Sequence, residues 1–68
     1  MVEELQNKVR IFRKKREWTQ AELAEKMGVS RKTVNTVENE VFAPSVIVAL
    51  KFARVLESNV EELFQLKE

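Results

Sequence analysis

The segment Thr19–Asn39 reads TQAELAEKMGVSRKTVNTVEN and predicts the fold, because it carries the signals of two short helices joined by a tight turn. Thr19 and Glu22 have the spacing of a capping box, in which the hydroxyl and the carboxylate each accept a free backbone N–H at a helix start. The apolar residues that follow share one face of this helix: Leu23, Ala24 and Met27. Gly28 ends the helix, since glycine enters the left-handed conformation without a Cβ clash.

A second helix is predicted to begin after Ser30, which is a typical N-cap residue. Val34 and Val37 form its buried stripe, and Val34 faces Ala24, a small residue where the two helices must cross closely. The outward face can form hydrogen bonds along its whole length, through Arg31, Lys32, Thr33, Asn35 and Thr36. A helix with a basic, amide- and hydroxyl-bearing outer face is what a helix-turn-helix presents to the major groove of DNA.

Composition favours one small all-α domain over residues 1–68 and excludes several functions. The chain has one glycine, one proline, no cysteine and no histidine. Disulfides and thiolate sites are thereby excluded, and the commonest metal ligand and general base is missing. We therefore expect no enzyme activity, no metal and no cofactor. Acidic residues precede any apolar stretch at the N-terminus, and no apolar run reaches the ~20 residues of a membrane span, so we expect a cytoplasmic protein.

Charge is unevenly distributed along the chain. Residues 8–32 carry nine Lys or Arg against three Glu, a balance of +6, whereas residues 38–68 carry three Lys or Arg against six Glu, a balance of −3. Such polarity suits a protein that turns its basic side toward a polyanion. On charge alone the alternative stays open, namely a helical protein that is simply rich in lysine and glutamate.

The chain resembles the Cro/C1-type (Xre-like) helix-turn-helix family of transcription regulators. The residues that carry the resemblance are Trp18-Thr19, Gln20, Leu23-Ala24, Gly28-Val29-Ser30, Thr33-Val34 and Val37-Glu38-Asn39. It extends from about Asn7 to Phe64 and includes the spacing to Pro44-Ser45 and to the segment 60–64. It implies an all-α, five-helix, lambda-repressor-like DNA-binding domain, with the helix-turn-helix of residues 19–39 at its second and third helices.

The expected elements follow from this pattern. The first helix is predicted to run from near Glu3 or Asn7 to Arg16. Pro44 marks a loop, and Ser45 caps a fourth helix over about 46–56 that buries Val46, Ala49, Leu50, Ala53 and Leu56. A fifth helix begins after Asn59, with Leu63 and Phe64 as its apolar anchors. The resemblance also implies one partly buried structural ion pair, between Arg13 and Glu38.

The outer face of the second and third helices supplies the expected DNA contacts. Gln20, at a helix start, is expected to bind a phosphate. Arg31 and Lys32 are expected to donate to guanine O6 and N7, and Asn35 to bond adenine N6 and N7. The full set of expected DNA-binding residues is Gln20, Ser30, Arg31, Lys32, Thr33, Asn35, Thr36 and Asn39.

Three turn positions that are commonly glycine in the family are glutamate here: Glu17, Glu40 and Glu57. In the family, a Gly-Lys or Gly-Arg pair at the positions of Glu40-Val41 brings a cation onto a phosphate. The replacement predicts either that this loop lies further from the DNA backbone or that binding is weaker than usual. Several apolar residues are expected on the surface, and those that form a candidate dimer or partner surface are Ile47, Val60, Leu63 and Phe64.

The sequence therefore predicts a sequence-specific regulator of transcription that binds double-stranded DNA, a repressor acting as a homodimer on a palindromic operator. Two alternatives stay open. The same fold serves an antitoxin that binds a toxin and represses its own operon, or a protein-interaction adaptor with weak DNA affinity. Exposed apolar residues and Glu40-Val41 favour these alternatives.

Overall fold

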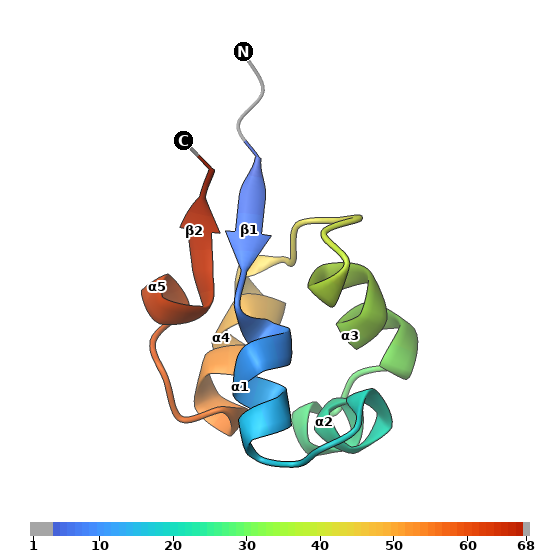
Figure 1. The fold of residues 1–68 in the computed structure, drawn as a ribbon. Coiled ribbons are helices and arrows are strands. Elements are labelled where there is room, and N and C mark those ends of the chain that lie inside the picture. Colours follow the sequence, from blue (N-terminus) through green and yellow to red (C-terminus); the bar gives the residue numbers. More distant parts are fainter. Residues whose placement is uncertain (1–3, 68) are drawn as a thin grey trace.

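The structure, a computed structural model, describes residues 4–67, which form five helices and two short strands. The helices are α1 (Val9–Lys15), α2 (Gln20–Met27), α3 (Arg31–Glu38), α4 (Val46–Val55) and α5 (Val60–Leu63). β1 (Leu5–Asn7) precedes α1, and β2 (Phe64–Leu66) follows α5 (Figure 1). The five-helix fold predicted from the sequence is confirmed, with a small sheet added to it. None of these helices has the length and apolar character that crossing a membrane requires.

The sheet corrects the prediction for both ends of the chain. β1 pairs with β2 in antiparallel register, with Gln6 opposite Gln65. The predicted helix start near Glu3 falls outside the described residues, but residues 5–7 are already strand, so a helix does not run through them. Asn7 instead leads into α1 by accepting the N–H of Val9 through Oδ1, at 3.1 Å. The sheet thus brings the two ends of the domain side by side (Figure 1).

The predicted starts of α2, α3 and α4 and the predicted turn after α2 are present. Thr19 Oγ1 accepts the N–H of Glu22 at 3.1 Å, and the Glu22 carboxylate accepts the N–H of Thr19 at 2.9 Å. Ser30 and Ser45 each accept the N–H of the residue three positions further on, at 3.2 and 3.1 Å. Gly28 has a φ of 73°, in the left-handed region. Local hydrogen bonds therefore fix where α2, α3 and α4 begin.

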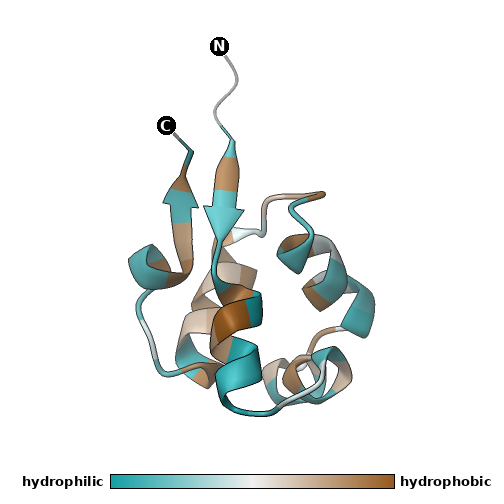
Figure 2. Cartoon of the chain, in the orientation of Figure 1, coloured by the Kyte–Doolittle hydropathy of each residue, from teal (hydrophilic) through white to brown (hydrophobic). Residues whose placement is uncertain are grey.

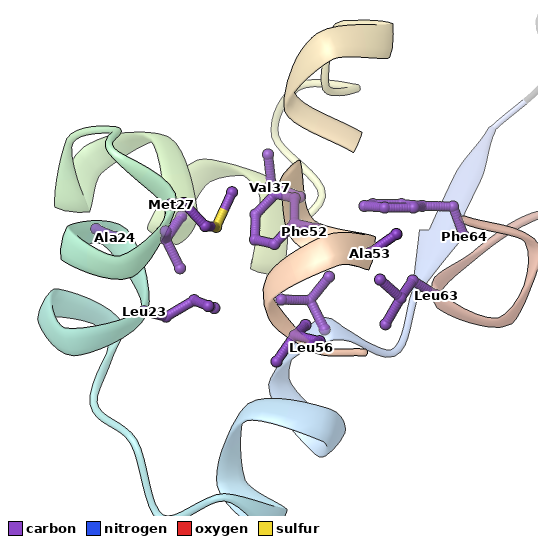
Figure 3. Close-up of a cluster of buried hydrophobic side chains, with 11 residues drawn as sticks. Leu23, Ala24, Met27, Val37, Phe52, Ala53, Leu56, Leu63 and Phe64 are labelled. Carbon is purple, nitrogen blue, oxygen red and sulfur yellow. The ribbon is translucent and has the colours of Figure 1, made fainter. Parts of the chain in front are cut away.

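The core lies between α2, α3, α4 and the C-terminal segment, as Figure 3 shows. Its largest fully buried side chains are Phe52, Leu23, Leu56, Leu63, Val9 and Val34. Phe52 stands in the middle of the cluster, and its ring meets the edge of Phe64 with centroids 5.9 Å apart. The hydropathy colouring shows apolar positions interleaved with hydrophilic ones along α1 to α4 (Figure 2).

The predicted buried face of α4 is partly wrong. Ala53 and Leu56 are buried and Ala49 is half-buried, but Val46 and Leu50 are 76% and 55% exposed. The physical reason is that α4 is apolar nearly all round, so its sequence contains more than one possible core stripe. Phe52 decides between them, because its large ring fills the centre of the core.

Candidate nucleic-acid interface

The outward face of α3 is the candidate interface. α3 lies at the edge of the molecule (Figure 1), and its ribbon is mostly hydrophilic (Figure 2). Val34, Val37 and Glu38 are its buried residues, as the sequence predicted for the two valines. The opposite side carries the expected DNA-binding residues: Arg31, Lys32, Asn35 and Asn39 are exposed, and Thr33 and Thr36 are half-buried.

The start of α3 presents two cations to solvent. Arg31 and Lys32 are exposed, and neither forms an ion pair with a residue in the described part of the chain. The hydroxyls nearby are engaged locally instead. Ser30 Oγ and Thr33 Oγ1 are 2.9 Å apart, and Thr36 Oγ1 donates to the carbonyl of Thr33 at 3.1 Å. The cations are thus the free charged groups of this face, while the hydroxyls stabilise the helix that carries them.

The end of α3 is tied to α1 by the predicted ion pair of Arg13 and Glu38. Arg13 Nε donates to Glu38 Oε2 at 2.7 Å and Nη2 donates to Oε1 at 3.0 Å, so the contact is bidentate. Arg13 Nη1 also donates to the carbonyl of Trp18 at 2.8 Å. Both residues of the pair are 8% exposed. This pair therefore links α1, the loop before α2 and the end of α3 in one buried contact.

Both partners are held in their charged forms. Burial by itself raises the pKa of Glu38, but hydrogen bonds from Arg13, Gln20 and Arg10 together with the charge of Arg13 lower it below its ordinary value of 4.5. The hydrogen bond to Glu38 in turn raises the pKa of Arg13, against the effect of burial. The carboxylate is consequently ionised at neutral pH.

A closed ring of hydrogen bonds continues from Glu38 onto the exposed face. It runs through five side chains: Arg10, Asn39, Asn35, Gln20 and Glu38. Arg10 Nη2 donates to Asn39 Oδ1 at 3.0 Å, and Arg10 Nε donates to Glu38 Oε1 at 3.3 Å. Asn39 Nδ2 donates to Asn35 Oδ1 at 2.9 Å. Gln20 Nε2 donates to Glu38 Oε1 at 3.1 Å and to Asn35 Oδ1 at 3.4 Å.

The ring engages the side chain of Gln20 and includes Arg10, which was not among the expected site residues. Gln20, expected to bind a phosphate, has its side-chain amide nitrogen directed at Glu38 and Asn35. Among the described residues its backbone N–H, at the start of α2, is the Gln20 donor without a partner. Arg10 was missed by the sequence interpretation. The available signal was its spacing: Arg10 and Arg13 are three residues apart and share the face of α1 that meets Glu38.

The loop after α3 carries the unusual Glu40. Its φ is 58°, in the region that favours glycine, as it is for the other two glutamates at turn positions, Glu17 at 58° and Glu57 at 52°. The Glu40 carboxylate lies 3.0 Å from Lys67 Nζ, and this partner lowers the pKa of Glu40. The negative charge at this position is therefore paired with the C-terminal segment.

The candidate partner surface is only partly available. Ile47 is 68% exposed and Val60 is half-buried, but Leu63 and Phe64 are buried in the core, so they are not on the surface of the monomer. Phe64 is also the first residue of β2, where its ring packs on Phe52. The structure instead exposes neighbouring apolar residues of α4 and the loop before it: Val41, Phe42, Val46 and Leu50.

The chain is similar in sequence and in structure to known helix-turn-helix proteins. The helix-turn-helix family model matches residues 9–63. An uncharacterized HTH-type transcriptional regulator of Archaeoglobus fulgidus is 42% identical over 60 residues, 88% of this chain and 86% of the relative. The HTH-type regulator YgzD of Bacillus subtilis, also uncharacterized, is 34% identical over 64 residues, 94% of this chain and 97% of the relative. The N-terminal DNA-binding domain of SinR from Bacillus subtilis has a TM-score of 0.73 at 30% identity, covering 78% of each chain. The chain belongs to the Cro/C1-type (Xre-like) helix-turn-helix family of transcription regulators.

Proposed function

We propose that this transcription regulator binds double-stranded DNA sequence-specifically through α3 and acts as a repressor, as a homodimer on a palindromic operator. One observation carries the proposal: α3 presents exposed Arg31, Lys32 and Asn35 on one face while the Arg13–Glu38 pair holds its other end to α1. A rigidly held polar helix at the edge of a basic segment is suited to the major groove. The likeness to the DNA-binding domain of SinR supports the DNA-binding part of this proposal.

Recognition divides between the two ends of this face. Arg31 and Lys32, free of ion pairs in the described residues, donate to the acceptor edge of guanine. Ser30 and Thr33 lie beside them at the helix start and contact the sugar-phosphate, together with Thr36 further along. Asn39 fixes the backbone register at the far end. Gln20 contributes its backbone N–H to a phosphate.

A homodimer is proposed because a single helix reads few base pairs. Twofold partners place their recognition helices in successive major grooves, roughly 34 Å apart. The exposed stripe of Val46, Ile47 and Leu50 on α4 supplies apolar area for the contact between subunits. Ile47→Glu should weaken the dimer in sedimentation experiments, and Ile11→Glu is the control, because Ile11 is the same residue type and is also exposed, on α1.

The test of DNA binding is fluorescence anisotropy with a random duplex pool at several salt concentrations, followed by selection of the bound fraction. A steep salt dependence and an enriched palindrome are expected. Lys32→Ala should then reduce discrimination between the selected and random duplexes by about 1–3 kcal/mol, and Arg54→Ala on α4 is the charge-matched control. Equal losses on both duplexes for Lys32→Ala would contradict base reading, and no binding at low salt would contradict the proposed function.

The alternative function is an antitoxin or adaptor that binds another protein. The observation that favours it is the exposed apolar pair Val41 and Phe42 in the loop after α3, where the family has a cation for DNA. In that case Phe42→Ser abolishes capture of a protein partner and leaves the weak DNA affinity unchanged. A selected palindrome bound tightly by the isolated protein decides for the repressor.

A further inference from the structure

We propose that Asn35 presents a hydrogen-bond donor, and no acceptor, to DNA, and that it donates to a single base acceptor instead of forming the bidentate contact with adenine expected from its residue type. The inference rests on the proposed function, since it concerns how the same α3 face selects its bases. It follows from the direction of the hydrogen bonds in the ring of Arg10, Asn39, Asn35, Gln20 and Glu38.

The first fixed direction comes from Arg10, whose guanidinium is only a donor. Because Arg10 Nη2 lies 3.0 Å from the Asn39 side chain, the atom facing it must be the carbonyl Oδ1. The Asn39 amide nitrogen then faces the other way, 2.9 Å from Asn35. The Asn35 atom that receives this donor must be its own Oδ1.

The second fixed direction comes from Glu38, whose ionised carboxylate is only an acceptor. Gln20 lies 3.1 Å from Glu38 Oε1, so its amide nitrogen must face the carboxylate. The same nitrogen lies 3.4 Å from Asn35 Oδ1. A donor-only group and an acceptor-only group thus fix the orientation of Asn35 independently, from both sides of the ring.

The consequence is that Asn35 can still donate a hydrogen bond but can no longer accept one. Asn35 Oδ1 accepts from both Asn39 and Gln20, which fills its two lone pairs, whereas Asn35 Nδ2 donates to no group in the described residues and Asn35 is exposed. An asparagine that recognises adenine must donate to N7 and accept from N6 at once. Here that bidentate pairing would break the ring, while donation to one acceptor alone (guanine O6 or N7, thymine O4 or adenine N7) leaves it intact.

Arg10 is accordingly a positioning residue. It touches no base in this scheme, but it sets the polarity of Asn39 and through it that of Asn35. Arg10 Nε also donates to Glu38 Oε1 at 3.3 Å, so Arg10 connects Asn39 with Glu38 and closes the ring. Removing its guanidinium frees the Asn39 amide to reverse, which opens one lone pair of Asn35 Oδ1 and leaves Gln20 as the remaining group that orients Asn35.

The free protein gives the first test, through hydrogen exchange of side-chain amides in a nitrogen-15 NMR spectrum. The Asn35 amide protons should exchange with water as fast as those of a free carboxamide, and those of Asn39 and Gln20 more slowly. Arg10→Met should remove the protection of Asn39, and Lys14→Met on the exposed side of α1 should not. Protected Asn35 protons, or an Asn39 amide unchanged in Arg10→Met, overturn the proposal without any DNA.

The second test uses the duplex selected by the protein, with single atoms removed from its bases. Asn35→Asp keeps an acceptor oxygen for the ring, replaces the outward donor with a second acceptor and adds a negative charge, so its binding to each altered duplex is compared with its own binding to the unaltered duplex. Removing the contacted guanine N7 or thymine O4 should weaken wild-type binding about fivefold, as for one neutral hydrogen bond, and leave Asn35→Asp unaffected. Removal of an adenine N6 amino group should not weaken binding through Asn35. The proposal is contradicted if this removal lowers the affinity of the wild-type protein and leaves that of Asn35→Asp unchanged. If no duplex is selected, the proposed function fails, and the exchange experiment still decides the polarity of Asn35.

Discussion

Two carboxylates at the end of α3 have the same chemistry and opposite surroundings. Glu38 is buried and receives hydrogen bonds from Arg13, Arg10 and Gln20. Glu40, two residues later, lies in the loop with a φ of 58° and meets one exposed cation, Lys67. In both cases the cation lowers the pKa of the carboxyl, yet Glu38 is buried and Glu40 is exposed.

The comparison shows that burial, more than the presence of a partner, decides what an ion pair does. A buried charge that loses its partner keeps the cost of desolvation, so the contact is strongly specified even where its net contribution is modest. An exposed pair is screened by water and salt and contributes little. Glu38 can therefore organise the α3 surface, whereas Glu40 adjusts the charge beside it.

The largest expected effect is the loss of the buried partner. Arg13→Ala leaves Glu38 buried without its bidentate donor, which should lower the free energy of unfolding by about 3–5 kcal/mol. For a domain of this size, that corresponds to a fall in melting temperature of more than about 12 °C. Lys67→Ala removes the exposed counterpart and should change the melting curve only slightly. Equal shifts in the two variants would contradict the distinction drawn from burial.

The next effect is on the acid side of the stability profile. Because the folded pKa of Glu38 lies below its ordinary value of 4.5, the folded state binds fewer protons than the unfolded chain in this region. Stability is thus fully present above about pH 4.5 and falls as pH decreases through the lower folded pKa. Urea unfolding from pH 7 to pH 3 should show this fall, reduced in Glu38→Gln.

Glu40→Gln provides the matched comparison for that titration. Its pKa is also lowered, chiefly by the hydrogen bond from Lys67, so its contribution is likewise present above about pH 4.5 and is lost as pH falls further. Because this contact is exposed, Glu40→Gln should reduce the acid-induced fall in the free energy of unfolding less than Glu38→Gln does. The opposite order would mean that the loop contact, and not the buried ring, controls acid stability.

Features that depend on neighbouring residues could be predicted from the sequence more directly than contacts between distant segments. The capping box of Thr19 and Glu22, the Ser30 cap and Gly28 act within one or two helical turns, and all are present as predicted. The Arg13–Glu38 pair was available only through the family resemblance, because its partners are 25 residues apart. Within the candidate interface, exposure of Arg31 and Lys32 follows directly from helical periodicity.

Other features depend on tertiary contacts that no local pattern encodes. β1 and β2 are three residues long, and each exists only because the other end of the chain lies beside it. The buried side of α4 is chosen by Phe52, since the helix has apolar residues on several faces. Arg10 likewise acquires its role only when α1 meets the end of α3.

A smaller effect concerns backbone strain at the turn glutamates. Glu57 has a φ of 52°, and its carboxylate lies 3.7 Å from Arg16 in an exposed contact. Glu57→Gly removes the cost of about 1–2 kcal/mol that a residue with a Cβ has in the left-handed conformation. Glycine also raises the conformational entropy of the unfolded chain, which offsets part of this gain, so the variant should stabilise the protein by up to about 1 kcal/mol. Glu61→Gly, in α5, should instead destabilise it by about 1 kcal/mol. Thermal melting distinguishes these outcomes, and destabilisation by both variants would show that the turn is not strained.

The smallest effect is expected for Glu40→Gly, where relief of strain and loss of an ion pair oppose each other. Its φ equals 58° and its carboxylate lies 3.0 Å from Lys67 Nζ, closer than the Glu57 contact with Arg16. In the wild-type background the melting temperature should therefore rise less than in Glu57→Gly. In a Lys67→Ala background the ion pair is already absent, so Glu40→Gly should stabilise as much as Glu57→Gly does, and the difference between backgrounds measures the pair. Equal stabilisation in both backgrounds would mean that the Lys67 contact contributes nothing and that Glu40 is free to turn its charge toward DNA.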